Sequence, residues 1–203
     1  IQPGDMKLRD VNGDGKVTPE DQTVIGHGLP VHIGGFTNNF EYKGFDLSIF
    51  FQWSYGNDVI NYNRYKLENM TSRNANLLAS AKDHWTPRID NGDGTYTEGN
   101  YTNYLCRVKG DIGNINTKRV VEDASFLRLK NVQLGYNFPV KLIKRLGISS
   151  LRLYVSGQNL WTWTKYTGYD PEVSTRNSAL TRGFDYSAYP KTTSYTFGVK
   201  LGL

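Results

Sequence analysis

Oxygen-bearing side chains recur at short, regular intervals near the start of the sequence. Between residues 10 and 21, Asp, Asn or Thr stands at loop positions 1, 3, 5, 9 and 12, with Gly at position 6. This is the spacing with which a twelve-residue loop wraps a calcium ion, although position 12 is usually Glu and here is Asp. The predicted Ca²⁺ ligands are Asp10, Asn12, Asp14, Thr18, Asp21 and the main-chain carbonyl of Lys16.

The same stretch also allows a simpler interpretation. Asn-Gly and Asp-Gly pairs form solvated turns without any metal, because glycine enters left-handed backbone conformations at little cost. If the ion binds, we expect it to be structural, since the carboxylates of Asp10, Asp14 and Asp21 repel one another in an empty loop. The calcium loop and the metal-free turn both stay open at this stage.

The other chemistry-bearing residues form no recognisable catalytic constellation. Cys106 is the only cysteine, so an internal disulfide is excluded and a catalytic or metal-binding role is not expected. The three histidines lie far apart in the sequence and are expected in loops or at the surface: His27, His32 and His84. The nearest carboxylate pairs are Glu122 with Asp123 and Asp170 with Glu172. Their spacing places neither pair opposite a nucleophile, so an enzyme is not predicted.

Several stretches alternate apolar and polar side chains, as β-strands with one apolar face do. In the most regular stretch the apolar residues are Phe45, Leu47, Ile49, Phe51, Trp53 and Tyr55. Similar alternation runs through residues 34–42, 125–138, 151–163 and 195–203. Aromatic residues close the apolar faces at both edges, which is how membrane-spanning strands meet lipid. The alternation slips at Lys130 and Asn159, which predicts a β-bulge there.

Composition limits what these strands can be. The mean hydropathy of −0.54 argues against a helical membrane protein, and no stretch reaches the ~20 consecutive apolar residues of a spanning helix. The net charge of +5 is scattered, with one dense cluster at Lys141, Lys144 and Arg145. Since no basic stripe is interleaved with aromatics, nucleic-acid binding is not expected. The sequence has no signal peptide and no initiator Met, so Ile1 is expected to be an internal position of a longer precursor.

A series of short motifs is spread over nearly the whole chain. In chain order they read GD followed by DVNGDG, then YKGFDL, EDASFLRLKNV with LGY, SGQNL and GYDPEV. This series resembles the C-terminal part of SusC/RagA-type TonB-dependent outer-membrane transporters. The resemblance implies an all-β fold that holds the last roughly five antiparallel strands of a large transmembrane β-barrel with long extracellular loops. The complete barrel of this family would have about 22 strands around an internal plug.

The resemblance also implies a function and a set of partners. It predicts TonB-driven import of oligosaccharides or peptides through the outer membrane of a Gram-negative, Bacteroidetes-like cell. The expected partners are the remaining N-terminal barrel and plug, a SusD-like surface lipoprotein, the TonB complex, a glycan or peptide substrate and outer-membrane lipid. In a barrel, Asp46, Ser48 and Gln52 would face the lumen.

Strand parity and loop length then predict how the chain is divided. Residues 1–30 form an extracellular loop, 31–55 a hairpin, 56–122 a long extracellular loop, 123–163 a hairpin with a periplasmic turn at 139–150, 164–191 an extracellular loop and 192–203 the C-terminal strand. Trp85, Tyr166 and Tyr169 in these loops are predicted to contact substrate or the lipoprotein lid, although aromatics that only pack loop against loop would look the same.

Two other classes of protein are compatible with parts of the sequence. A soluble, secreted β-rich binding module with a dockerin-like calcium loop would explain the Asp-rich stretch, because dockerin-type loops also carry Asp at position 12. It leaves unexplained why aromatics close both ends of apolar-faced strands. An outer-membrane enzyme is the second alternative, and it would need a catalytic constellation that the spacing does not provide.

Overall fold

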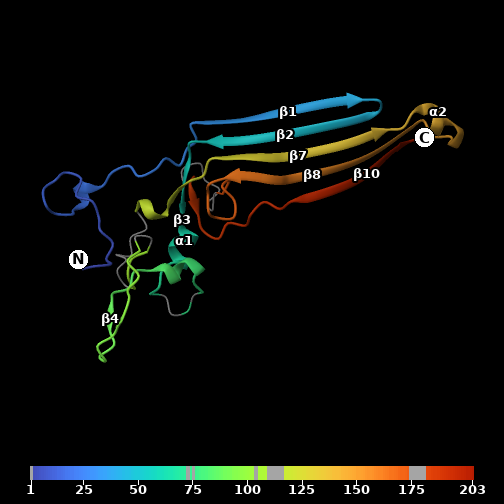
Figure 1. The fold of residues 1–203 in the computed structure, drawn as a ribbon. Coiled ribbons are helices and arrows are strands. Elements are labelled where there is room, and N and C mark those ends of the chain that lie inside the picture. Colours follow the sequence, from blue (N-terminus) through green and yellow to red (C-terminus); the bar gives the residue numbers. More distant parts are fainter. Residues whose placement is uncertain (1, 72–73, 75, 103–104, 109–116, 174–181) are drawn as a thin grey trace.

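A five-stranded antiparallel sheet dominates the structure, a computed structural model that describes residues 2–71, 74, 76–102, 105–108, 117–173 and 182–203 (Figure 1). Its strands follow the order β1-β2-β7-β8-β10. Their bounds are β1 (His32–Tyr42), β2 (Phe45–Tyr55), β7 (Phe126–Asn137), β8 (Ser150–Thr164) and β10 (Ser194–Gly202). The expected fold class of roughly five antiparallel strands is confirmed. Among the described residues, no helix combines the length and apolar character needed to cross a membrane.

The register of the sheet gathers apolar side chains on one face. A single row crosses all five strands: Phe40, Leu47, Leu134, Val155 and Phe197. The next row along the strands, Glu41, Asp46, Gly135, Tyr154 and Gly198, lies on the opposite face, because successive side chains of a strand point to opposite sides. Large apolar side chains on the first face are widely exposed in this chain, with Phe197 at 80% and Phe40 at 57%.

The bulge predicted from the alternation is confirmed. Phe50 pairs with Asn131 and Phe51 with Leu129, so Lys130 is an extra residue in β7. The pairing of β7 with β8 shifts at the same place, and Asn159 takes a left-handed backbone conformation with φ of 51°. A bulge keeps the apolar residues on one face before and after the slip.

The two ends of the sheet are built differently. At what we call the turn end, Lys43 and Gly44 close the β1–β2 hairpin with φ of 47° and 88°, and a short connection with α2 (Val140–Ile143) and η4 (Lys144–Leu146) joins β7 to β8. At the other end, which we call the loop end, all the long connections gather (Figure 1). Ile1 and parts of the expected loops 56–122 and 164–191 lie outside the described residues.

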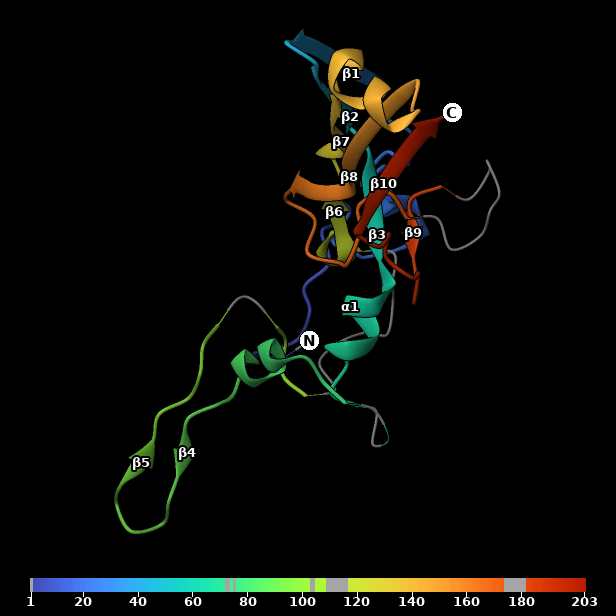
Figure 2. The ribbon, with the colours of Figure 1, turned by 90° about the vertical axis from the view of Figure 1, so that its right-hand side faces the viewer.

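The loop end contains a small sheet and one helix that the sequence pattern does not indicate. The sheet has the order β6-β3-β9, from β3 (Asp58–Asn61), β6 (Val121–Asp123) and β9 (Phe184–Asp185), and β3 leads directly into α1 (Tyr62–Leu67). The other elements there are η1 (Pro19–Asp21), η2 (Ala79–Asp83), η3 (Lys118–Val120), β4 (Ile89–Asp90) and β5 (Tyr96–Thr97). Figure 2 shows the hairpin of β4 and β5 projecting away from the rest of the chain.

Candidate functional site at the loop end

A buried arginine on the polar face of β7 holds the segment that follows β8. Arg128 is 2% exposed, and its guanidinium donates to Thr162 Oγ1 on β8 at 3.0 Å. It also donates to Asp170 Oδ1 at 2.5 Å and to Glu172 Oε2 at 3.2 Å. The chain after β8 therefore folds back across the polar face. We call Arg128, Asp170, Glu172 and Lys191 the clamp.

The clamp connects the residues just after β8 with the residues just before β10. The second oxygen of Asp170 accepts the main-chain N–H of Lys191 at 3.2 Å, and the Lys191 ammonium pairs with Glu172. Burial alone would raise the pKa of Asp170, but the Glu172 N–H and the Arg128 guanidinium outweigh it and hold that pKa below its ordinary value. A buried carboxylate paired in this way tolerates the loss of its cation poorly, because an uncompensated charge would be left out of water.

A second buried contact ties β9 to the end of β8. Tyr166 is 5% exposed and packs with Val59 and Ala124, and its hydroxyl donates to Asp185 Oδ2 at 2.5 Å. Burial and the nearby Asp185 carboxylate raise the pKa of the Tyr166 hydroxyl, which keeps it protonated as a donor. The structure thus places Tyr166 inside the loop scaffold. Its predicted contact with substrate or lid stays a prediction.

The carboxylates considered for catalysis have structural partners. Glu122 accepts hydrogen bonds from the main-chain N–H of Thr167 at 2.9 Å and from the Asn61 side chain at 3.2 Å, and it pairs with Arg64 at 3.2 Å. Arg64 also pairs with the buried Glu68 in the same helical region at 3.1 Å. These contacts connect β6, β3 and α1, so they hold the loop scaffold together. The other carboxylate pair, Asp170 and Glu172, forms the ion pairs of the clamp.

Tyr169 is the most accessible of the three predicted contact residues, with 82% of its surface exposed. It borders a hollow of about 650 Å³ together with Tyr186 and Tyr189, two residues that the sequence analysis did not single out. An aromatic-rich composition in the same loop is the signal that could have found them. Trp85 has a different setting, because its ring lies 6.1 Å from that of Tyr101 and packs against Gly4.

The calcium-type loop is closed by side-chain oxygens that accept main-chain hydrogen bonds. Asp21, 9% exposed in η1, accepts the N–H groups of Thr18 at 2.7 Å, Val11 at 2.8 Å and Asn12 at 3.3 Å. The N–H of Thr18 contributes most to holding the pKa of Asp21 below its ordinary value. Asp10 accepts from two glycine N–H groups at 2.6 and 2.8 Å.

The other side-chain oxygens of this loop also accept main-chain hydrogen bonds. Asn12 Oδ1 and Asp14 Oδ1 accept the N–H groups of the residues two positions later, at 2.9 and 2.8 Å. A carboxylate or amide oxygen that accepts one hydrogen bond keeps a further lone pair, so these oxygens still suit a hard cation chemically. Among the described residues, however, no three His, Cys, Asp or Glu side chains converge into a metal-binding group. The calcium site stays a prediction.

The class of protein follows from the fold. An antiparallel meander with an apolar face, short turns at one end and long connections at the other is the arrangement of a β-barrel segment. The RagAB peptide transporter is similar in structure, with a TM-score of 0.70 and 27% identity over 93% of this chain and 20% of that chain. Its 'closed-closed' state, described as a peptide importer, gives a TM-score of 0.66. The sheet is therefore a fragment of a receptor barrel of this type.

Curated sequences name the family more closely. A TonB-dependent receptor of Formosa agariphila is 36% identical over 98% of this chain, and the TonB-dependent receptor SusC of Bacteroides thetaiotaomicron is 27% identical over 98%. The chain spans 19% and 18% of the length of these relatives. No family model matches the chain. The expected resemblance is confirmed, and this chain corresponds to a segment of a SusC/RagA-type TonB-dependent receptor.

Proposed function

We propose that this chain forms part of the wall and the outer mouth of a TonB-dependent transporter that imports oligosaccharides or peptides across the outer membrane. The observation that carries the proposal is the apolar row across all five strands, whose members Phe197 and Phe40 remain 80% and 57% exposed. A soluble protein would have to cover such a face, whereas lipid covers it in a barrel. The same exposed apolar face also disfavours the soluble binding module.

The polar face would line the lumen, and the loop end would face outward. Bacterial barrels have short periplasmic turns and longer extracellular loops, so the Lys43–Gly44 turn lies on the periplasmic side in this proposal. The clamp then fixes an outer segment against the mouth of the lumen. This position presents the exposed Tyr169 to incoming substrate or to a lid, while Tyr166 stays buried in the scaffold three residues earlier.

The partners follow from what the sheet leaves unpaired. Strands β1 and β10 are the edges of the described sheet, and an open edge within lipid would leave main-chain groups without partners. We propose that the remaining barrel of the same receptor pairs with both edges and encloses a plug. The same receptor would also contact TonB. A SusD-like surface lipoprotein would act as the lid over the loop end, as the similarity to SusC and RagAB supports.

Calcium binding is part of the proposal for the outer surface. Asp10, Asp14 and Asp21 would supply charge, and the Asn12 side chain, the Thr18 hydroxyl and the Lys16 carbonyl would supply neutral oxygens. A bound ion would stabilise the loop that precedes β1 by neutralising its carboxylates. This role is structural, so no transport step depends on the ion.

The transport proposal is tested in the organism that produces the receptor. Deletion of the receptor gene should abolish growth on one oligosaccharide or peptide, and growth should return with the wild-type gene. Deletion of the TonB gene should give the same loss. Import that continues in both deletion strains, measured with a labelled form of that nutrient, would contradict the proposed function.

A further inference from the structure

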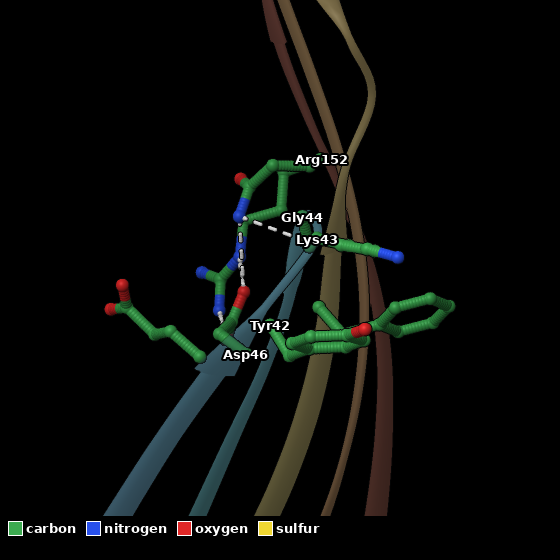
Figure 3. A pocket seen from close by; sticks show the side chains of 8 residues that line it. Tyr42, Lys43, Gly44, Asp46 and Arg152 are labelled. Atoms are coloured by element: carbon green, nitrogen blue, oxygen red, sulfur yellow. Dashed lines mark hydrogen bonds and ion pairs between the residues drawn. The ribbon is translucent and has the colours of Figure 1, made fainter.

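The turn end carries an aromatic and basic border on the apolar side of the sheet. The rings of Phe45 and Tyr136 lie 4.5 Å apart, those of Tyr136 and Phe138 lie 4.9 Å apart, and Lys43 Nζ lies 5.1 Å from the Tyr42 ring. Figure 3 shows Tyr42 and Lys43 on one side of the strands. Such a cluster of aromatic rings is typical of the boundary between hydrocarbon and headgroups.

Two opposite charges on the other side of the same end neutralise each other within the chain. Asp46 forms an ion pair with Arg152 and accepts a hydrogen bond from Asn137 Nδ2 at 3.1 Å. These residues line a hollow of about 510 Å³, and Figure 3 shows Asp46 and Arg152 pointing away from Lys43. Asp46 and Arg152 therefore add no net charge to the polar side.

The connection between β7 and β8 adds cations that have no acidic partner in the described chain. Residues 138–149 contain Lys141, Lys144 and Arg145 and no Asp or Glu. All three side chains are exposed, and none of them forms an ion pair within the part of the chain that the structure describes. We call these three residues and Lys43 the basic turn.

Apolar side chains are interleaved with these cations. Val140 is 57% exposed and Leu142 is 67% exposed, while Ile143 is only 4% exposed and anchors the short helix α2 next to β8. Exposed apolar groups between lysines suit a membrane interface, where they enter the acyl region and the lysines reach back to the headgroups. In water the same pattern would leave both apolar groups uncovered.

We propose that the basic turn binds the phosphate groups of anionic glycerophospholipids in the leaflet at the turn end. The charge of the basic turn complements that of the lipid phosphates. The aromatic border sets the depth at which the turn end lies in the membrane, and the exposed apolar residues of α2 insert into the acyl region. The attractions of basic residues near an anionic surface add up, so the four cations of the basic turn act together. The choice of a glycerophospholipid rests on the proposed orientation, in which this end faces the periplasm.

The test uses the complete receptor that contains this chain, purified in detergent and titrated with phosphatidylglycerol, phosphatidylcholine or lipid A under native mass spectrometry. The variant carries K141Q, K144Q and R145Q. A matched control carries K7Q, K82Q and K118Q, which remove three exposed cations at the loop end. We expect wild type and control to retain phosphatidylglycerol preferentially, and the turn variant to lose this preference by about tenfold or more. Added salt should reduce the preference in wild type, because the interaction is between exposed charges.

Three results would overturn the proposal, and the third of them would also contradict the proposed orientation. Equal retention by wild type and turn variant, or an equal loss in the control, would remove the basic turn as the binding site. Retention of lipid A phosphates, lost in the turn variant in place of phosphatidylglycerol, would put the turn in the outer leaflet and would also contradict the proposed orientation. Heat-modifiable migration on gels checks that each variant has a folded barrel. Nutrient import in cells is measured separately, so failure of the lipid proposal is distinguishable from failure of the transport proposal.

Discussion

The five-stranded sheet and the loop end are stabilised in opposite ways. The sheet depends on a regular hydrogen-bond ladder and has almost no core of its own, and its large apolar side chains are exposed. The loop end contains the small apolar cluster of Val59, Ala124 and Tyr166 and several buried charges, with Arg128 and Asp185 at 2% and 1% exposure. A lipid-facing wall tolerates changes on its polar face, whereas a scaffold of buried ion pairs depends on each partner.

The largest effect is expected when the clamp loses its cation. Replacing Arg128 by Met leaves Asp170 buried without its guanidinium partner, and breaking a buried pair costs about 3–5 kcal/mol. We expect the segment around residues 165–173 to lose protection from hydrogen exchange while the strands keep theirs. A double variant with D170N removes the uncompensated charge and should recover part of the loss. Unchanged protection in R128M would show that the clamp does not hold the loop.

The next effect compares the two faces of one strand. Ile49 lies on the apolar face of β2 and its neighbour Ser48 lies on the polar face. Arg at Ile49 should cost about 2–4 kcal/mol near the middle of the bilayer, which lowers the amount of assembled receptor in the outer membrane. Arg at Ser48 is the matched control and should be tolerated. Equal amounts of the two variants in purified outer membranes would contradict the assignment of faces.

These residues also show how much of the fold can be predicted from the sequence. Period-2 alternation was enough to predict the long strands, their apolar faces and the bulge at Lys130, because each of these is a local property of the chain. The small sheet was missed, since β3, β6 and β9 have only two to four residues each and pair across long intervals of sequence. Strands so short carry no detectable period.

The clamp could not be predicted for a similar reason. Asp170 and Glu172 stand in a motif that marks the family, but no local pattern indicates that they meet an arginine 42 and 44 residues earlier in the chain. The aromatic loop residues show the same limit. Tyr166 and Tyr169 look equivalent in the sequence, yet one is 5% exposed and the other 82%. Burial of a loop aromatic is decided by tertiary contacts.

The smallest effect is expected from the proposed calcium loop. Replacing Asp10 and Asp14 together by Ala should make residues 10–21 sensitive to protease while the barrel stays folded, because the loop lies before β1. Titration of the wild-type receptor with Ca²⁺ should protect the same loop, and Mg²⁺ should protect it less, since magnesium keeps its water shell. Protection that is unaffected by chelator in the wild type would favour the metal-free turn.

The central claim is that the loop end faces the cell exterior and the turn end faces the periplasm. Cysteine labelling on intact cells with a membrane-impermeant maleimide tests it, in a receptor whose Cys106 has been replaced by Ser. Cys at Tyr169, which is 82% exposed, should react without permeabilisation, and Cys at Ser149, a polar residue exposed at the turn end, should react only after the outer membrane is opened. Reaction of Ser149→Cys on intact cells, with Tyr169→Cys protected until permeabilisation, would contradict the account.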